Sequence, residues 1–176
     1  TLSVTPIAIP GLSASLYGHN EQAALVCSVY DAPPGGRRAL AYLPGLGSDA
    51  YYLDDPSFGL QNIPEGWHTR SAVDLNSHGV IVGNMELDDA PDTDVRPMYI
   101  TGISSGAPVL NTLGPFDSAA WHEAAAGVND SGDMVVWSQE RMADDSLVDS
   151  LYVGNPGLHG QSPTPFIEID FASAGY

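Results

Sequence analysis

The chain has 176 residues, 43% of them apolar, which is enough for one domain with a hydrophobic core. Five Lys and Arg against 22 Asp and Glu leave a net charge of −17, which repels a phosphate backbone, so no nucleic-acid partner is expected. No stretch approaches the roughly 20 apolar residues of a membrane-spanning helix, so no membrane span is expected either.

The first predicted element is an apolar segment from Leu2 to Ile9, which Pro6 interrupts and so favours as an edge strand. The chain starts at Thr1 without an initiator Met, as a processed mature chain or an excised fragment would, which is compatible with export. Further along, an apolar run ends at Cys27, the only cysteine, which excludes an internal disulfide. We expect Cys27 to be a small buried strand residue rather than a reactive thiol.

One turn pattern recurs along the chain. Its structural turn residues are Asn20, Asn76, Gly79, Asn129 and Gly132, and an apolar run follows each turn. Asn hydrogen-bonds its own backbone two residues on, and Gly accepts the positive φ that closes a short hairpin. The first copy has Ala23 in the Gly position, so that turn must adopt another geometry or tolerate strain.

The recurring Asn residues are 56 and 53 positions apart, a spacing typical of propellers, solenoids and arrays. A Tyr follows each Asn after 22 or 23 positions; these residues are Tyr42, Tyr99 and Tyr152. The two markers define three copies, at about residues 12–60, 67–113 and 121–170, within one repeat domain of residues 1–176. Each copy offers four strands, and residues 54–66, which lack periodicity, predict a long surface connection.

The sequence therefore predicts an all-β protein of three four-stranded, propeller-like blades from repeats of about 53 residues. Propellers typically close with about four to eight blades. Three blades must therefore associate with other copies, continue into further repeats, or use another three-fold design such as a trefoil-like barrel. The extra N-terminal strand favours the first two alternatives, because it could complete a neighbouring blade and so build a homo-oligomer or filament.

Two segments carry a family resemblance. Residues 127–135 read Gly-Val-Asn-Asp-Ser-Gly-Asp-Met-Val, and residues 76–83 read Asn-Ser-His-Gly-Val-Ile-Val-Gly. Both resemble the bacterial extracellular HAF repeat, in which Gly-Ile-Asn-x-x-Gly-x-x-Val-Gly is followed by a His-Ala-Phe strand. The chain departs from that pattern, because the tripeptide His is absent from all three copies and Tyr replaces its Phe. The resemblance implies a secreted or surface-attached, propeller-like protein and no particular activity.

A Trp-His pair precedes the second and third Asn by nine and eight residues; the pairs are Trp67-His68 and Trp121-His122. Trp can stack on a sugar ring while His hydrogen-bonds its hydroxyls, so these four residues are candidate glycan ligands. The alternative is an aromatic plug between adjacent blades with a hydrogen-bonded His.

The loop of the second copy carries four carboxylates within seven residues: Asp88, Asp89, Asp92 and Asp94. Such hard oxygen ligands suit Ca²⁺, although the spacing is not that of an EF-hand. The alternative is a solvated acidic face. In the third copy, Asp144, Asp145 and Asp149 occupy the equivalent loop. No cofactor is expected, with Ca²⁺ as the one candidate.

No zinc-binding His spacing, no Gly-x-Ser-x-Gly elbow and no phosphate-cradling loop with Lys occurs, so no catalytic residue is predicted. We therefore expect a non-enzymatic structural or adhesive protein, extracellular or at the cell surface, that self-associates through its blades or by strand exchange. A carbohydrate-binding, lectin-like propeller that uses the Trp-His pairs is the alternative, and an enzyme of unknown type is the third.

Overall fold

A computed structural model describes residues 13–30, 36–44, 50–88, 94–114 and 120–169 of the chain. Within them the protein is all-β, as predicted, with three four-stranded antiparallel sheets. Two short 3-10 turns, Ile103–Ser105 (η2) and Leu158–Gly160 (η3), follow β7 and β11. The predicted strand from Leu2 to Ile9 lies outside the described residues.

Each sheet consists of four consecutive strands in chain order. The first sheet contains β1 (Ser13–His19), β2 (Leu25–Tyr30), β3 (Arg37–Tyr42) and β4 (Ala50–Tyr52). The second contains β5 (Trp67–Leu75), β6 (Ile81–Leu87), β7 (Val95–Thr101) and β8 (Val109–Thr112). The third contains β9 (Ala120–Val128), β10 (Met134–Arg141), β11 (Leu147–Asn155) and β12 (Thr164–Glu168).

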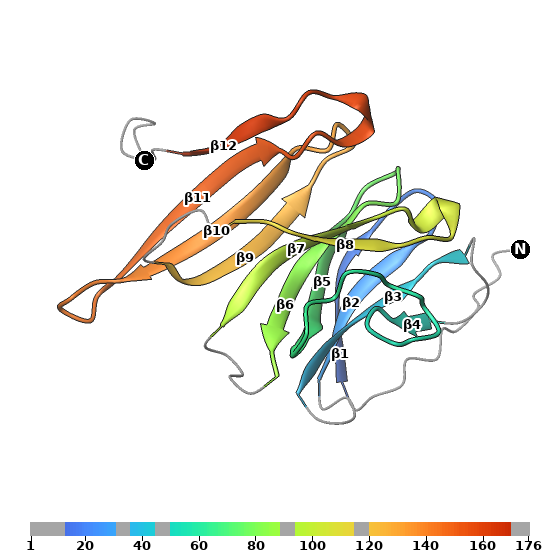
Figure 1. Ribbon diagram of the computed structural model, residues 1–176, viewed down its shortest axis with the longest axis horizontal. Helices are drawn as coiled ribbons and strands as arrows, with labels where there is room; N and C mark the ends of the chain where they lie inside the picture. Colours follow the sequence, from blue (N-terminus) through green and yellow to red (C-terminus); the bar gives the residue numbers. More distant parts are fainter. Residues whose placement is uncertain (1–12, 31–35, 45–49, 89–93, 115–119, 170–176) are drawn as a thin grey trace, which may run out of the picture.

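The three sheets are stacked in chain order (Figure 1). The first strand of each later sheet lies against the preceding sheet: β5 contacts β1, β2 and β3, and β9 contacts β5, β6 and β7. We call the contact between the first and second sheets junction 1, and that between the second and third sheets junction 2. A four-stranded sheet has no core of its own, so most of the buried apolar side chains lie at the two junctions. A smaller buried cluster of Cys27, Val29 and Leu40 lies on the other face of the first sheet.

The alternation of side chains along β6 shows how the middle sheet serves both junctions. Ile81 belongs to the hydrophobic cluster of junction 1, whereas its neighbour Val82 belongs to that of junction 2. Val26 of the first sheet and Met134 of the third sheet are buried at the opposite sides of these junctions. Burying one such side chain stabilises the fold by about 1.5–3 kcal/mol, so stacking holds the sheets together.

The recurring turn keeps one backbone geometry in all three copies. The third residue after each Asn has a positive φ, which is 60° at Ala23, 76° at Gly79 and 87° at Gly132. The N–H of this residue donates to the carbonyl of the Asn at 3.0–3.1 Å. The first turn therefore tolerates strain rather than changing its geometry, because a left-handed conformation is costly for a residue with a Cβ atom.

A β-bulge interrupts the first strand of every sheet three residues before the Asn, at Tyr17, Val73 and Ala126. In the second sheet the bulge lies between Ala72 and Leu75, which are both buried in junction 1. Residues three positions apart point to opposite faces of a regular strand. The bulge is therefore what turns both side chains toward the preceding sheet.

The three Tyr markers are not equivalent in the sheets, and this part of the repeat prediction is wrong. The pairs are Tyr42 with Leu25, Tyr99 with Val82 and Tyr152 with Val136. The partners stand five, six and seven residues after their Asn, because the β2–β3, β6–β7 and β10–β11 hairpins differ in length. A one-residue change in register turns a side chain to the other face. Tyr99 and Tyr152 therefore meet in junction 2 from opposite sheets, and Tyr42 does not enter junction 1.

The prediction of a surface connection at residues 54–66 is wrong in part. Phe58 is buried in the cluster of junction 1, and Leu60 and Ile63 pack against that cluster. Gln61 forms a parallel bridge with Val109 at the edge of the second sheet. The segment lacks periodicity, but its three apolar side chains are enough to draw it onto the core.

Candidate functional site

The recurring Asn side chains form a ladder from sheet to sheet. The Oδ1 atoms of Asn20 and Asn76 each accept the N–H groups two and four residues further along the chain, at 2.9–3.1 Å. The Nδ2 atoms reach the next sheet, since Asn20 donates to Asn76 O and Asn76 donates to Asn129 O, both at 3.0 Å. Each amide thus shapes its own turn and ties that turn to the following sheet.

Asn129 ends the ladder in a different way. Its Nδ2 donates to Asp133 Oδ2 at 2.9 Å, within the same turn. Asp133 also accepts a hydrogen bond from Asn155 Nδ2 at 3.1 Å. The two amides lower the pKa of Asp133, so this position carries a carboxylate. The equivalent positions in the other turns are the buried residues Ala24 and Val80.

A polar hollow of about 420 Å³ lies between the three turns. Its lining includes Glu21, Ser77 and Asp130, the residue that follows the Asn in each copy. Asp130 Oδ1 accepts the N–H of Ser77 at 2.8 Å, and the hydrogen bonds from Ser77 lower the pKa of Asp130. Beside it the rings of His78 and His159 lie 4.2 Å apart. Beside the hollow, the turns that follow β5 and β9 are therefore hydrogen-bonded to each other.

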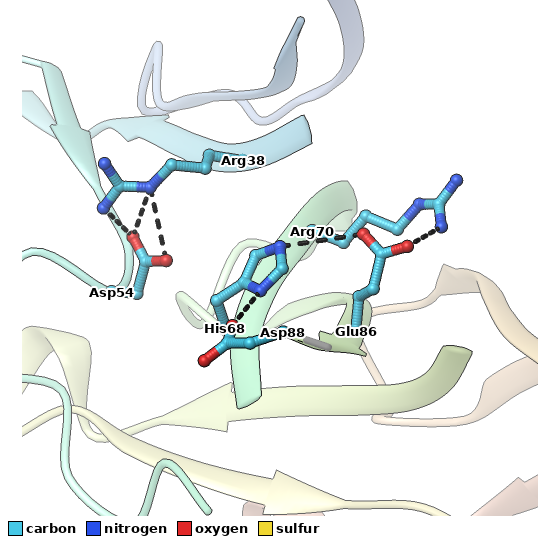
Figure 2. A network of polar contacts seen from close by, with 6 residues as sticks. All are labelled: Arg38, Asp54, His68, Arg70, Glu86 and Asp88. Atoms are coloured by element: carbon cyan, nitrogen blue, oxygen red, sulfur yellow. Dashed lines mark hydrogen bonds and ion pairs between the residues drawn. The ribbon is translucent and has the colours of Figure 1, made fainter. Parts of the chain in front are cut away.

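The first Trp-His pair takes part in packing through Trp67 and in an ionic network through His68. Figure 2 shows His68 with its network. Trp67 is half-buried and packs against the cluster of junction 1. His68 Nδ1 lies 2.7 Å from Asp88 Oδ1, and its Nε2 lies 3.6 Å from Glu86 Oε2. Glu86 is buried and accepts a hydrogen bond from Arg70 Nη1 at 2.6 Å. Trp67 thus contributes to junction 1 and His68 contacts two carboxylates, while glycan binding by this pair stays a prediction.

The second pair has different surroundings. The ring of His122 lies 5.4 Å from the ring of Trp137, and the side chain of Trp121 lies outside the described part of the structure. The sequence aligns this histidine with His68, and the ring contact with Trp137 places it on the same face of the third sheet as Trp137.

The predicted Ca²⁺ ligands of the second copy divide into two groups. Asp88 contacts His68, Asp94 forms an ion pair with Arg96 Nε at 2.9 Å, and Asp89 and Asp92 lie outside the described residues. Across the described ranges, no three or more His, Cys, Asp or Glu side chains form a group that could hold a metal ion. The Ca²⁺ site stays a prediction.

The carboxylates of the third copy contact protein groups. Asp144 accepts a hydrogen bond from Ser146, Asp145 pairs with Arg141 at 3.1 Å, and Asp149 accepts from Gln139 Nε2 at 2.8 Å. These contacts are local, within the β10–β11 hairpin.

The sequence did not reveal an ion pair across junction 2 between a buried carboxylate and a partly exposed arginine. Glu123 on β9 is fully buried, and its Oε2 lies 3.4 Å from Arg96 Nη1 on β7. The one signal in the sequence is that Glu123 is a charged residue within a strand of alternating side chains. That signal does not identify Arg96 as its partner. Cys27 is buried as expected, and burial raises the pKa of its thiol.

The most informative surface is the outer face of the third sheet, formed by Val135, Trp137, Leu151, Val153 and Ile167. In the register of the sheets, Val135 corresponds to Val26 and Val82, which are both fully buried at the junctions. Ile167 pairs with Val153 and is 63% exposed, whereas Tyr51, at the corresponding place in the first sheet, packs into junction 1. Nothing among the described residues stacks on this face as a fourth sheet. An unpartnered apolar sheet face of this kind is typical of an interaction surface.

The described residues contain no helix with the length and apolar character needed to cross a membrane. Comparison of the chain with protein-family models, with curated proteins and with solved structures finds no match.

Proposed function

We propose that this protein is a secreted, non-enzymatic structural or adhesive module that self-associates, with the outer face of the third sheet as its contact surface. The observation that carries the proposal is the exposure of Ile167 at a position whose counterpart in the first sheet, Tyr51, is packed into junction 1. Terminal units of a repeat array usually carry a polar outer face, whereas the outer face of the third sheet is apolar. Its extracellular location follows from the resemblance of the turns to a secreted repeat.

Association by face-to-face stacking fits the described residues better than strand exchange. Each of the three sheets already has its own fourth strand, namely β4, β8 and β12. An exchanged strand would therefore have to add a fifth strand at an edge, whereas stacking repeats the contact made at both junctions.

The test is the mass of the purified chain in solution, measured by sedimentation from micromolar to millimolar concentration. We expect concentration-dependent association, weakened about tenfold or more by Ile167→Asp, because a charge on a buried apolar contact costs well over 1.4 kcal/mol. Met142→Asp is the matched control, since Met142 is an exposed apolar residue in the β10–β11 turn. A parent chain that stays monomeric at millimolar concentration contradicts the proposal.

A further inference from the structure

The two short 3-10 turns occupy equivalent places in the second and third sheets. η2 follows β7 and η3 follows β11, and each begins after a glycine with a left-handed backbone. The first residue of each turn packs at the junction with the preceding sheet: Ile103 belongs to the cluster of junction 1, and Leu158 packs against that of junction 2. The residues that follow them, Ser104 and His159, therefore correspond in position and differ greatly in size.

At junction 2 the larger residue fills the space between two consecutive turns. The His159 ring lies 4.2 Å from the ring of His78, with an angle of 37° between the ring planes. Its Nε2 accepts a hydrogen bond from Asn76 Nδ2 at 3.3 Å, since an amide nitrogen can only donate. A Cβ atom built on Gly132 would stand 3.4 Å from His159 Cδ2 and 2.8 Å from Leu158 Cβ. The imidazole is thus held by both turns and hydrogen-bonded by the Asn of the first.

At junction 1 the corresponding place is a hollow of about 320 Å³. Its lining includes Gln22 and Ser104, the counterparts of His78 and His159. It also includes Gly79, and no described atom lies within 4 Å of a Cβ built there, whereas the equivalent glycine of junction 2 meets two side chains. The hollow thus lies where the His159 ring stands at junction 2, and we call it the Gly79 hollow.

The Gly79 hollow keeps the features that hold the imidazole at junction 2. Its apolar lining includes Ala24, Leu43 and Ile103. Asn20, the counterpart of Asn76, also lines it. Asn76 Nδ2 bonds both to the next turn and to the imidazole, whereas within the described residues Asn20 Nδ2 makes only the first bond, to Asn76 O at 3.0 Å. The second N–H of Asn20 can therefore donate to a group in the hollow.

We propose that the Gly79 hollow binds a neutral imidazole ring, which lies beside Gln22 and accepts a hydrogen bond from Asn20 Nδ2. The ring must be neutral, because a protonated imidazole has no nitrogen left to accept a hydrogen bond. Pockets for small ligands have volumes of about 300–1,000 Å³, so the hollow also admits a substituent on the ring. The hollow lies at junction 1 and not on the outer face of the third sheet, so this inference is independent of the proposed self-association.

The site is tested by titrating the parent chain with 4-methylimidazole at about pH 8, where an imidazole is mostly neutral, and following amide chemical shifts. We expect saturable shifts in the turns after β1 and β5 and in η2, with a dissociation constant of about 1 mM for so small a ligand. Toluene has a flat ring without an acceptor nitrogen and should bind about tenfold more weakly. Equal binding of toluene would overturn the bond to Asn20, and no saturable shift with 4-methylimidazole would overturn the site.

Two variants at one exposed position locate the binding. Ser104→Trp places a large side chain at the lining, so we expect it to weaken 4-methylimidazole binding about tenfold or more. Ser104→Ala is the matched control and should bind as the parent does, because the Ser104 hydroxyl makes no contact in the proposed site. Unchanged binding by Ser104→Trp would place the ligand elsewhere and overturn the assignment.

A third variant and a peptide complete the test. His159→Ser removes the ring at junction 2 and should create a second site there, which raises the stoichiometry from one to two; a stoichiometry of one would overturn the correspondence between the two places. The peptide Gly-His-Gly distinguishes the sources of the ring. Binding as tight as that of 4-methylimidazole assigns the hollow to a histidine side chain of a partner, and weaker binding assigns it to a free imidazole compound.

Discussion

Replacing Ala23 by Gly should stabilise the protein. Ala23 has a φ of 60°, and a left-handed conformation costs a residue with a Cβ atom about 1–2 kcal/mol. Glycine loses about 0.5–1 kcal/mol more conformational freedom on folding, which offsets part of the gain. The expected result is a free energy of unfolding higher by about 0.5–1 kcal/mol, which corresponds to a rise in Tm of about 1–4 °C for a chain of this length.

The assay is urea unfolding followed by circular dichroism, with the midpoint compared at constant m value. Gly79→Ala is the matched control, since no atom lies within 4 Å of the added Cβ. It introduces the cost of the left-handed backbone without a steric clash, so it should lower the free energy of unfolding. Gly132→Ala should cost more, because its Cβ would stand 2.8 Å from Leu158 Cβ. A midpoint lowered by Ala23→Gly, or one raised by Gly79→Ala, would refute the reasoning about strain.

Three further changes have defined outcomes in the same unfolding assay. Asn76→Ala should cost about 2–3 kcal/mol, because two N–H groups lose their acceptor and one carbonyl loses its donor, whereas Asn129→Ala, at the exposed end of the ladder, should cost less. Thr69→Val should gain about 1 kcal/mol, since the buried Thr69 Oγ1 has no hydrogen-bond partner among the described residues; a loss would imply an unseen partner. The pKa of Asp130 in the folded protein is below its ordinary value of 3.8. Its contribution to the stability of the fold is therefore fully present above pH 3.8 and is lost as the pH falls through the folded pKa. Asp130→Asn should therefore flatten the acid limb of the stability curve, and an unchanged limb would contradict this role.

The local part of the fold could be predicted because it depends on residues close in sequence. Asn and Gly determine the turn. Ala23 adopts the same positive φ, at the cost in strain that its Cβ atom brings. The Tyr markers misled for a physical reason: sequence spacing does not fix register when hairpin loops differ in length. The bulges carry no residue signature, since Tyr17, Val73 and Ala126 share no property that favours a bulge.

The candidate site could be predicted only in part. The turn role of Asn76 follows from its sequence, but its bond to Asn129 O depends on how two sheets stack 53 residues apart. The sequence shows that Ile167 is apolar but not that it is exposed. Its exposure depends on whether another sheet covers it, and none does among the described residues. The Trp-His pairs looked alike in sequence, but the spacing could not show that His68 lies beside Asp88 or that His122 lies beside Trp137.

The Asn ladder also determines where the molecule opens first. Asn76 takes part in both cross-sheet bonds, whereas Asn20 and Asn129 take part in one each. Separating either outer sheet breaks one bond of the ladder and exposes one junction, but releasing the middle sheet breaks both ladder bonds and exposes both junctions. Amide hydrogen exchange should therefore be slowest in β5 and β6 and faster in the outer sheets. Transient opening of this kind would present single sheets to proteases long before the whole chain unfolds.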